Sequence, residues 1–129
     1  ICLRPLAVVL PETIHEYLDF VDAENRHWLF YYIWAADLAK AFEAAVNLEG
    51  LKYGVFFISA DDTSHPLPTQ EWYQHTMGSV PEIKHPLWYQ HNPRASIFSS
   101  AAAKSILGWQ PSTDFTQLRA QYAQAATTH

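Results

Sequence analysis

The residues of this chain best suited to metal chemistry are its seven histidines. Transition-metal sites commonly take their ligands at short, fixed spacings, such as His-x-His or His-Glu-x-x-His. Neither spacing occurs, and the stretch HEYLD at residues 15–19 lacks the second histidine. The histidines stand far apart in the sequence, at His15, His27, His65, His75, His85, His91 and His129. We therefore predict no metal site.

The adjacent acids Asp61 and Asp62 are the other residues that suggest chemistry. Two neighbouring carboxyl groups can divide general-acid and general-base roles when their environments push their pKa values apart. Acidic residues directly ahead of Thr63 and Ser64 are more typical of a turn or a loop cap, which is the interpretation we favour. The chain also has no P-loop, GxGxxG or GxSxG motif, and its four glycines are scattered. The sequence thus predicts no complete set of catalytic residues.

Composition limits the protein to a few classes. The 129 residues, 49% of them hydrophobic, suffice for one domain with a core. A net charge of −5 without a basic run argues against a nucleic-acid partner. The single cysteine, Cys2, excludes an internal disulfide, and no apolar run approaches the roughly 18 residues that span a bilayer. We expect a cytoplasmic protein with no membrane partner.

The first two-thirds of the chain alternates between predicted strands and helices. The apolar runs at 6–10 and 54–59 are typical of parallel strands covered on both faces. A helix over 37–50 is expected to bury a stripe, and a helix over 69–78 to begin at Thr69 as its N-cap. The expected stripe comprises Leu38, Phe42, Ala45 and Val46. One or two helical turns are expected within 12–31, and the order of elements predicts an α/β fold.

The C-terminal third predicts a strand at 95–98, a helix over 100–108 capped by Ser100, and a last amphipathic helix over 113–125. Gly108 suits the left-handed position just after a helix, and Pro111 cannot continue that helix. Trp109 is therefore expected to fold back onto the preceding turn. Because Ile1 opens directly on a strand, without an initiator methionine or a signal peptide, we expect the chain to begin partway through a longer protein.

Taken in order, five stretches resemble the C-terminal part of the NAD-dependent epimerase/dehydratase family, the extended short-chain dehydrogenase/reductases. They are LRPLAVVLP, YYIWAADLAKAFEAAV, GVFFISADDT, PTQEWY and SIFSSAAAKSILGWQPSTDF. The resemblance covers nearly the whole chain. It implies an α/β fold that is the C-terminal portion of a Rossmann-type enzyme, with a few strands flanked by helices. Residues 1–129 would form one domain, the substrate-binding lobe, closed by the segment from Leu107 to Pro111.

The resemblance also implies which parts of such an enzyme lie outside this chain. The glycine-rich dinucleotide fingerprint and the catalytic Ser/Thr and Tyr-x-x-x-Lys of the family precede the strand with which the chain opens. By resemblance, Arg4, Pro5, Leu6 and Ala7 come closest to the nicotinamide end of NAD or NADP. We expect the cofactor to bind only in the longer protein, and the present chain to supply no catalytic residue.

The substrate expected from the resemblance is a small sugar or sugar acid. Phe30 stands where many relatives carry an arginine that holds a substrate diphosphate, and an aromatic ring cannot replace a guanidinium there. We expect Arg94, Trp34 and His91 to contact the substrate. Arg94 has a structural alternative, which is a surface ion pair with an acid such as Glu82.

Two classes of function remain open. The chain is either the substrate lobe of an oxidoreductase, inactive alone, or a non-catalytic binding domain that keeps a reductase-derived fold. We favour the first, because the apolar strands of a free-standing lobe would lack the helices that normally cover a parallel sheet. Unpaired strand edges also lead us to expect a homo-oligomer.

Overall fold

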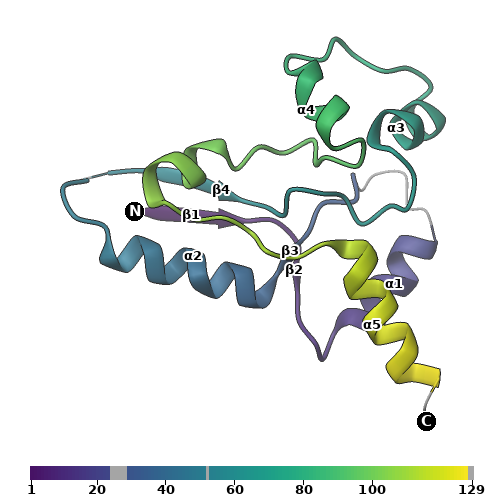
Figure 1. The fold of residues 1–129 in the computed structure, drawn as a ribbon, viewed down its shortest axis with the longest axis horizontal. Coiled ribbons are helices and arrows are strands. Elements are labelled where there is room, and N and C mark those ends of the chain that lie inside the picture. The colour runs from purple at the N-terminus through teal and green to yellow at the C-terminus, as the bar shows by residue number, and fades with distance from the viewer. Residues whose placement is uncertain (24–28, 52, 128–129) are drawn as a thin grey trace.

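The computed structural model describes residues 1–23, 29–51 and 53–127, with no side chains described from 124 onward. The fold is mixed α/β, as expected, with small sheets (Figure 1). The elements in chain order are β1 (Cys2–Pro5), β2 (Val8–Val9), α1 (Ile14–Asp22), β3 (Ile33–Trp34), α2 (Ala35–Asn47), β4 (Val55–Ile58), α3 (Thr69–Met77), α4 (Pro86–His91), a π-helical turn (Ala103–Leu107) and α5 (Phe115–Thr127).

Two parallel strand pairs form the centre of the fold. β1 lies beside β4, with Cys2 opposite Val55 and Pro5 opposite Ile58, and β2 pairs with β3. Parallel neighbours need a long crossover between them. Helix α2 lies in the connection from β1 to β4, and α1 lies in the connection from β2 to β3. In Figure 1, α2 runs along the β1–β4 pair, α1 and α5 lie together, and α3 and α4 form a separate group.

The strand expected at 6–10 is shorter and differently placed. The chain bends at Ala7, so that β1 ends at Pro5 and β2 covers only Val8 and Val9. Val9 is buried and Val8 is 42% exposed, which is the alternation of a strand covered on one face. In β4, Phe56 and Ile58 are buried whereas Phe57 is 47% exposed. The expectation that both runs are covered on both faces is therefore wrong.

Helix α2 is confirmed, but its buried face differs from the expected stripe. Ala41 and Asp37 are its buried residues, whereas Phe42 and Val46 are exposed. Leu38 and Ala45 are half-buried, as the stripe requires. The helix thus buries its small Ala41 in the core that contains Ile33 and Trp109, and leaves the larger side chains of Phe42 and Val46 exposed.

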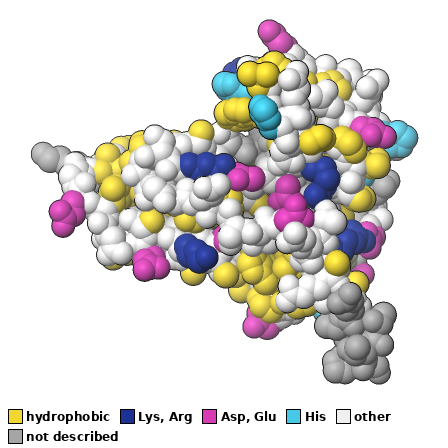
Figure 2. All heavy atoms as spheres, viewed as in Figure 1, with side chains coloured by type: hydrophobic (Ala, Val, Ile, Leu, Met, Phe, Trp, Pro, Cys, Tyr) yellow, Lys and Arg dark blue, Asp and Glu magenta, His cyan; other side chains and the backbone are white. Residues whose placement is uncertain are grey.

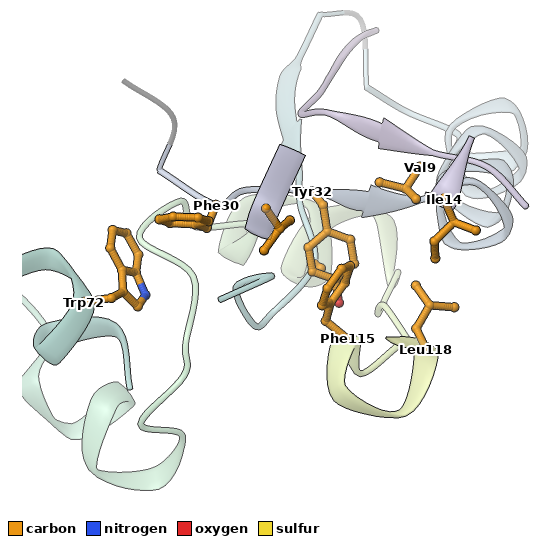
Figure 3. Close-up of a cluster of buried hydrophobic side chains, with 9 residues drawn as sticks. Val9, Ile14, Phe30, Tyr32, Trp72, Phe115 and Leu118 are labelled. Carbon is orange, nitrogen blue, oxygen red and sulfur yellow. The ribbon is translucent and has the colours of Figure 1, made fainter. Parts of the chain in front are cut away.

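The core has two parts. One contains Ile33, Ala41, Phe56 and Ile58 together with Trp109 and its neighbours. The other joins α1, β2, β3, α3 and α5. In it, Tyr32 packs against Phe115 and Phe30 against Trp72, with ring centroids 4.9 and 5.0 Å apart (Figure 3). The last helix thus packs on the same core as the first.

Several local expectations can be compared with the structure. Helix α1 is confirmed and buries Ile14 and Val21. Helix α3 begins at Thr69 with Pro68 as its N-cap, because the Thr69 hydroxyl donates instead to the carbonyl oxygen of Ala95 at 2.5 Å. The strand expected at 95–98 is wrong, since Ala95 makes only an isolated bridge to Asp62.

The helical region around 100–108 ends as expected but is not capped as expected. Ser100 accepts a hydrogen bond from the amide of Ser59 at 2.9 Å and donates to the carbonyl oxygen of the same residue, so it does not cap the helix. Gly108 has φ +68°, the left-handed conformation that ends the helix. Helix α5 is confirmed, whereas α4 and β3 were not predicted. The stretch 24–28, with His27, and His129 lie outside the described residues.

Candidate functional site

A buried aspartate ties the start of α2 to the segment before α5. Asp37 is 1% exposed, and its carboxylate accepts hydrogen bonds from the Ser112 amide at 3.1 Å, the Ser112 hydroxyl at 2.8 Å and the Thr113 amide at 3.2 Å. Its position in the first helical turn is also favourable, because the amino end of a helix attracts negative charge. Asp37 therefore holds segments that are 75 residues apart in sequence.

Trp109 is part of the same junction. Gly108 turns the chain back, and the indole is then 4% exposed within the core beside α2. Its Nε1 donates to the carbonyl oxygen of Asp37 at 2.9 Å, which satisfies the one polar atom of the buried side chain. The Leu107–Pro111 segment thus contacts α2 through the hydrogen bond and the packing of Trp109.

The carboxyl ends of β1 and β4 lie side by side, where ligands commonly bind in open parallel sheets. The Leu6 amide donates to the Ile58 carbonyl oxygen, and the Ala7 carbonyl oxygen accepts from Ile33. Arg4 and Pro5 are exposed, and the Arg4 guanidinium lies 5.9 Å from the centre of the Phe57 ring. The four residues expected near a nicotinamide thus lie at this edge.

In the loop after β4, Asp62 is the centre of a buried polar network. Its carboxylate accepts from the Tyr32 hydroxyl at 2.5 Å and from the Phe115 amide at 2.8 Å, at the amino end of α5. The Arg94 guanidinium lies 3.6 Å away. The expected turn or loop cap is therefore wrong for Asp62. The amides of Thr63 and Ser64 donate to the carbonyl oxygens of Arg94 and Phe30, and the buried Asp62 carboxylate instead caps the start of α5.

The buried groups of this network have shifted pKa values. Burial raises the pKa of the Asp62 carboxyl above its ordinary value, although the Tyr32 hydrogen bond, the Phe115 amide and Arg94 each lower it. Burial, with the Asp62 charge, also raises the pKa of Tyr32, and burial raises that of Tyr17. Both phenols are therefore neutral hydrogen-bond donors rather than bases at ordinary pH.

Asp61 takes a different role from its neighbour. Its carboxylate pairs with the Lys104 ammonium at 2.5 Å, and both side chains are about two-fifths exposed. The Asp61 carbonyl oxygen accepts from the Ser96 amide at 2.8 Å. Ser96 and Ser59 are both buried beside this pair, with their hydroxyl oxygens 3.5 Å apart. The two aspartates therefore point to separate partners and do not form a carboxyl dyad.

A cavity of about 640 Å³ opens next to this group, between α3, the segment 80–85, α4 and the segment 96–101. Its lining is mainly apolar and aromatic, and includes Tyr73, Ile83, Trp88, Tyr89 and Ile97. Ser96 lies in its wall. Figure 2 shows hydrophobic and histidine side chains gathered over the α3–α4 part of the visible face.

The residues expected to bind substrate are not among those that line this cavity. Arg94 is largely enclosed, and its guanidinium donates to the carbonyl oxygens of Thr63 and His65 and to the Thr116 hydroxyl. Trp34 packs against Tyr122, with ring centroids 6.0 Å apart. His91 is exposed at the end of α4. The structure therefore does not bring these three side chains together in one site. Arg94 forms an ion pair with Asp62, whereas the expected alternative was Glu82.

The cavity itself was not anticipated, because its walls come from a Pro- and His-rich stretch with no clean period. One sequence signal pointed to this region. Trp88 and Tyr89 follow Pro86, and proline is favoured in the first turn of a helix.

Within the described ranges, no three histidine, cysteine or acidic side chains are close enough to hold a metal ion. In the same part of the chain, no helix is long and apolar enough to cross a membrane.

Comparison with protein-family models, curated proteins and solved structures finds no match to this chain. The resemblance to the epimerase/dehydratase family therefore rests on the residues alone and stays a prediction.

Proposed function

We propose that this chain is the substrate-binding lobe of an NAD(P)-dependent oxidoreductase of the epimerase/dehydratase type. The observation that carries the proposal is the exposed parallel pair β1–β4. Parallel strands occur mainly in larger sheets covered by helices on both faces. Within the described residues, however, β1 pairs with β4 alone, and Phe57 is 47% exposed. A further strand and covering helices from a cofactor domain would complete such a sheet.

The second support is the junction built by Asp37 and Trp109. It joins two of the stretches on which the resemblance depends, one at the start of α2 and one ahead of α5. A role in closing the lobe explains why these residues occur together. In the complete enzyme, NAD or NADP would approach Arg4–Ala7 at the carboxyl ends of the strands. The cofactor would supply hydride chemistry, and the residues upstream would supply the catalytic groups.

The substrate class that accompanies this proposal is a sugar or sugar acid, with contacts from Arg94, Trp34 and His91. Arg94 has three contacts that hold it in place, so its part in binding would be limited to the polar atoms that face solvent. Open strand edges also support self-association of the chain as a homo-oligomer.

The alternative is a non-catalytic binding domain with a reductase-derived fold. The coding sequence upstream of Ile1 distinguishes the two. The proposal expects a glycine-rich strand–turn–helix followed by Tyr-x-x-x-Lys in the same reading frame. A translation start close to Ile1, or an upstream region without these motifs, would favour the binding domain.

A further inference from the structure

We propose that the cavity between α3, α4 and the segment 96–101 binds a neutral, planar aromatic group that carries a hydrogen-bond acceptor. This site goes beyond the oxidoreductase function and does not depend on it, because every wall of the cavity comes from the present chain. Its volume of about 640 Å³ lies within the range of small-molecule sites, roughly 300 to 1,000 Å³.

The shape and chemistry of the walls favour a flat ring. Trp88 stacks on His85, with ring centroids 4.2 Å apart and planes inclined by 16°, and remains 44% exposed. Tyr73 and Tyr89 add two more rings to the lining. Aromatic side chains attract another ring through offset stacking or edge contacts, and burying the exposed part of Trp88 adds hydrophobic stabilisation. An aromatic ligand would gain from both effects.

Ser96 supplies a directional donor. Its oxygen accepts from the Phe98 amide at 3.1 Å. The Ser59 hydroxyl has one hydrogen, which it donates to the Ala60 carbonyl oxygen at 3.0 Å. This leaves the Ser59 hydroxyl oxygen as an acceptor for the hydroxyl hydrogen of Ser96. The two hydroxyl oxygens are 3.5 Å apart, which is well beyond the usual length for a hydrogen bond between hydroxyls. A ligand carbonyl or ether oxygen that entered the cavity would be a better acceptor.

Two engaged hydroxyl groups and one pair of opposite charges in the wall disfavour a hydroxyl-rich or strongly charged ligand. The hydroxyl groups of Thr69 and Tyr89 already donate to the carbonyl oxygens of Ala95 and Ser96. These two hydroxyl hydrogens are therefore not available to a sugar, and a sugar would gain less than a flat ring from the aromatic lining. Glu82 and Lys84 both line the cavity, so their charges balance and provide no cluster of cations for an anion.

A titration of the 129-residue chain with 2-acetylnaphthalene tests this site, with binding followed by ligand-observed NMR. The expected result is one saturable site with a dissociation constant of about 1 mM or below. Trp88→Ala should weaken binding about tenfold or more, because large aromatic side chains dominate such contacts. Leu87→Ala, which removes a more exposed side chain of the same helix that does not line the cavity, should leave the constant unchanged.

Two further variants separate the cavity from surface adsorption. Ala101→Phe places a ring in the cavity from an exposed position and should abolish binding without loss of helical circular dichroism. Ser96→Ala should weaken binding about three- to tenfold through the lost donor. Absence of saturable binding would overturn the proposal, as would affinity that is unaffected by both Trp88→Ala and Ala101→Phe. Tighter binding of glucose than of 2-acetylnaphthalene would contradict the ligand class.

Discussion

Replacing Asp37 with alanine tests whether the α2–α5 junction depends on this carboxylate. The substitution leaves the amides of Ser112 and Thr113 without their acceptor, while the exposed Ser112 hydroxyl can turn to water. Both hydrogen bonds are partly buried, so each amide that loses its acceptor should cost an amount toward the lower end of the about 1 to 3 kcal/mol of an unpaired buried donor. The two amides together therefore predict a loss of about 3 kcal/mol in the free energy of unfolding, which is a large part of the roughly 5 to 15 kcal/mol of a typical domain.

Thermal and urea unfolding followed by circular dichroism would measure this loss. For a domain of this size we expect a fall in Tm of about 12 °C, at roughly 4 °C per kcal/mol. Asp37→Asn keeps one acceptor and should lie between the wild type and Asp37→Ala. Glu43→Ala, at an exposed position of the same helix, should change stability by less than about 0.5 kcal/mol.

Amide hydrogen exchange gives a local readout of the same junction. In the Asp37→Ala variant, the amides of Ser112 and Thr113 should exchange faster even under conditions where the rest of the chain stays folded. A variant that retains wild-type stability within about 1 kcal/mol, with both amides still protected, would refute the assignment of Asp37 as the residue that holds this segment.

Three other predictions follow from the polar network and the open strands. Because burial raises the pKa of Asp62 in the folded state, wild type should gain stability relative to Asp62→Asn as the pH falls toward 4 in a urea titration series. A relative loss over that range would mean that the folded pKa is depressed. Arg94→Ala should lower the free energy of unfolding by about 2 to 4 kcal/mol, and Arg94→Lys should rescue little of it, since an ammonium cannot reach all three acceptors; a cost below 0.5 kcal/mol in both would identify a dispensable surface cation. Light scattering at micromolar concentration should report a dimer or larger species, because in the part of the chain that the structure describes β1 pairs with β4 alone. A monomer at all concentrations would show that the other edge of β1 is protected.

The parts of the fold that the sequence predicted well are those with strong local signals. Gly108 before Trp109 predicted a helix end because only a residue without Cβ enters the left-handed region cheaply. Helices α2 and α5 followed from their 3.6-residue periodicity. The run VFFI predicted a strand, since β-branched and aromatic residues suit a pleated surface. These features need no knowledge of distant segments.

The remaining features depend on contacts between distant residues, which periodicity does not reveal. Ser100 and Thr69 have the residue types of helix caps, yet their hydroxyls bond to residues 41 and 26 positions away. The exposure of Phe42 and Val46 depends on what covers α2. The network of Asp62 combines Tyr32, Arg94 and Phe115, whose positions in sequence carry no common motif. The sequence therefore singled out Asp62 but predicted a cap of its own loop instead of the start of α5, and it did not predict the cavity.

We propose that this chain lacks a dinucleotide site and completes an enzyme that has one. Titration of NADH while following its fluorescence tests this claim most directly, on the 129-residue chain and on the polypeptide that includes the encoded residues upstream of Ile1. The pyrophosphate is held by backbone amides at a glycine-rich helix start, which this sequence does not contain. We expect no saturable binding to the 129-residue chain and micromolar binding to the longer polypeptide. Micromolar binding to the 129-residue chain itself, or no binding to the longer polypeptide, would contradict the account.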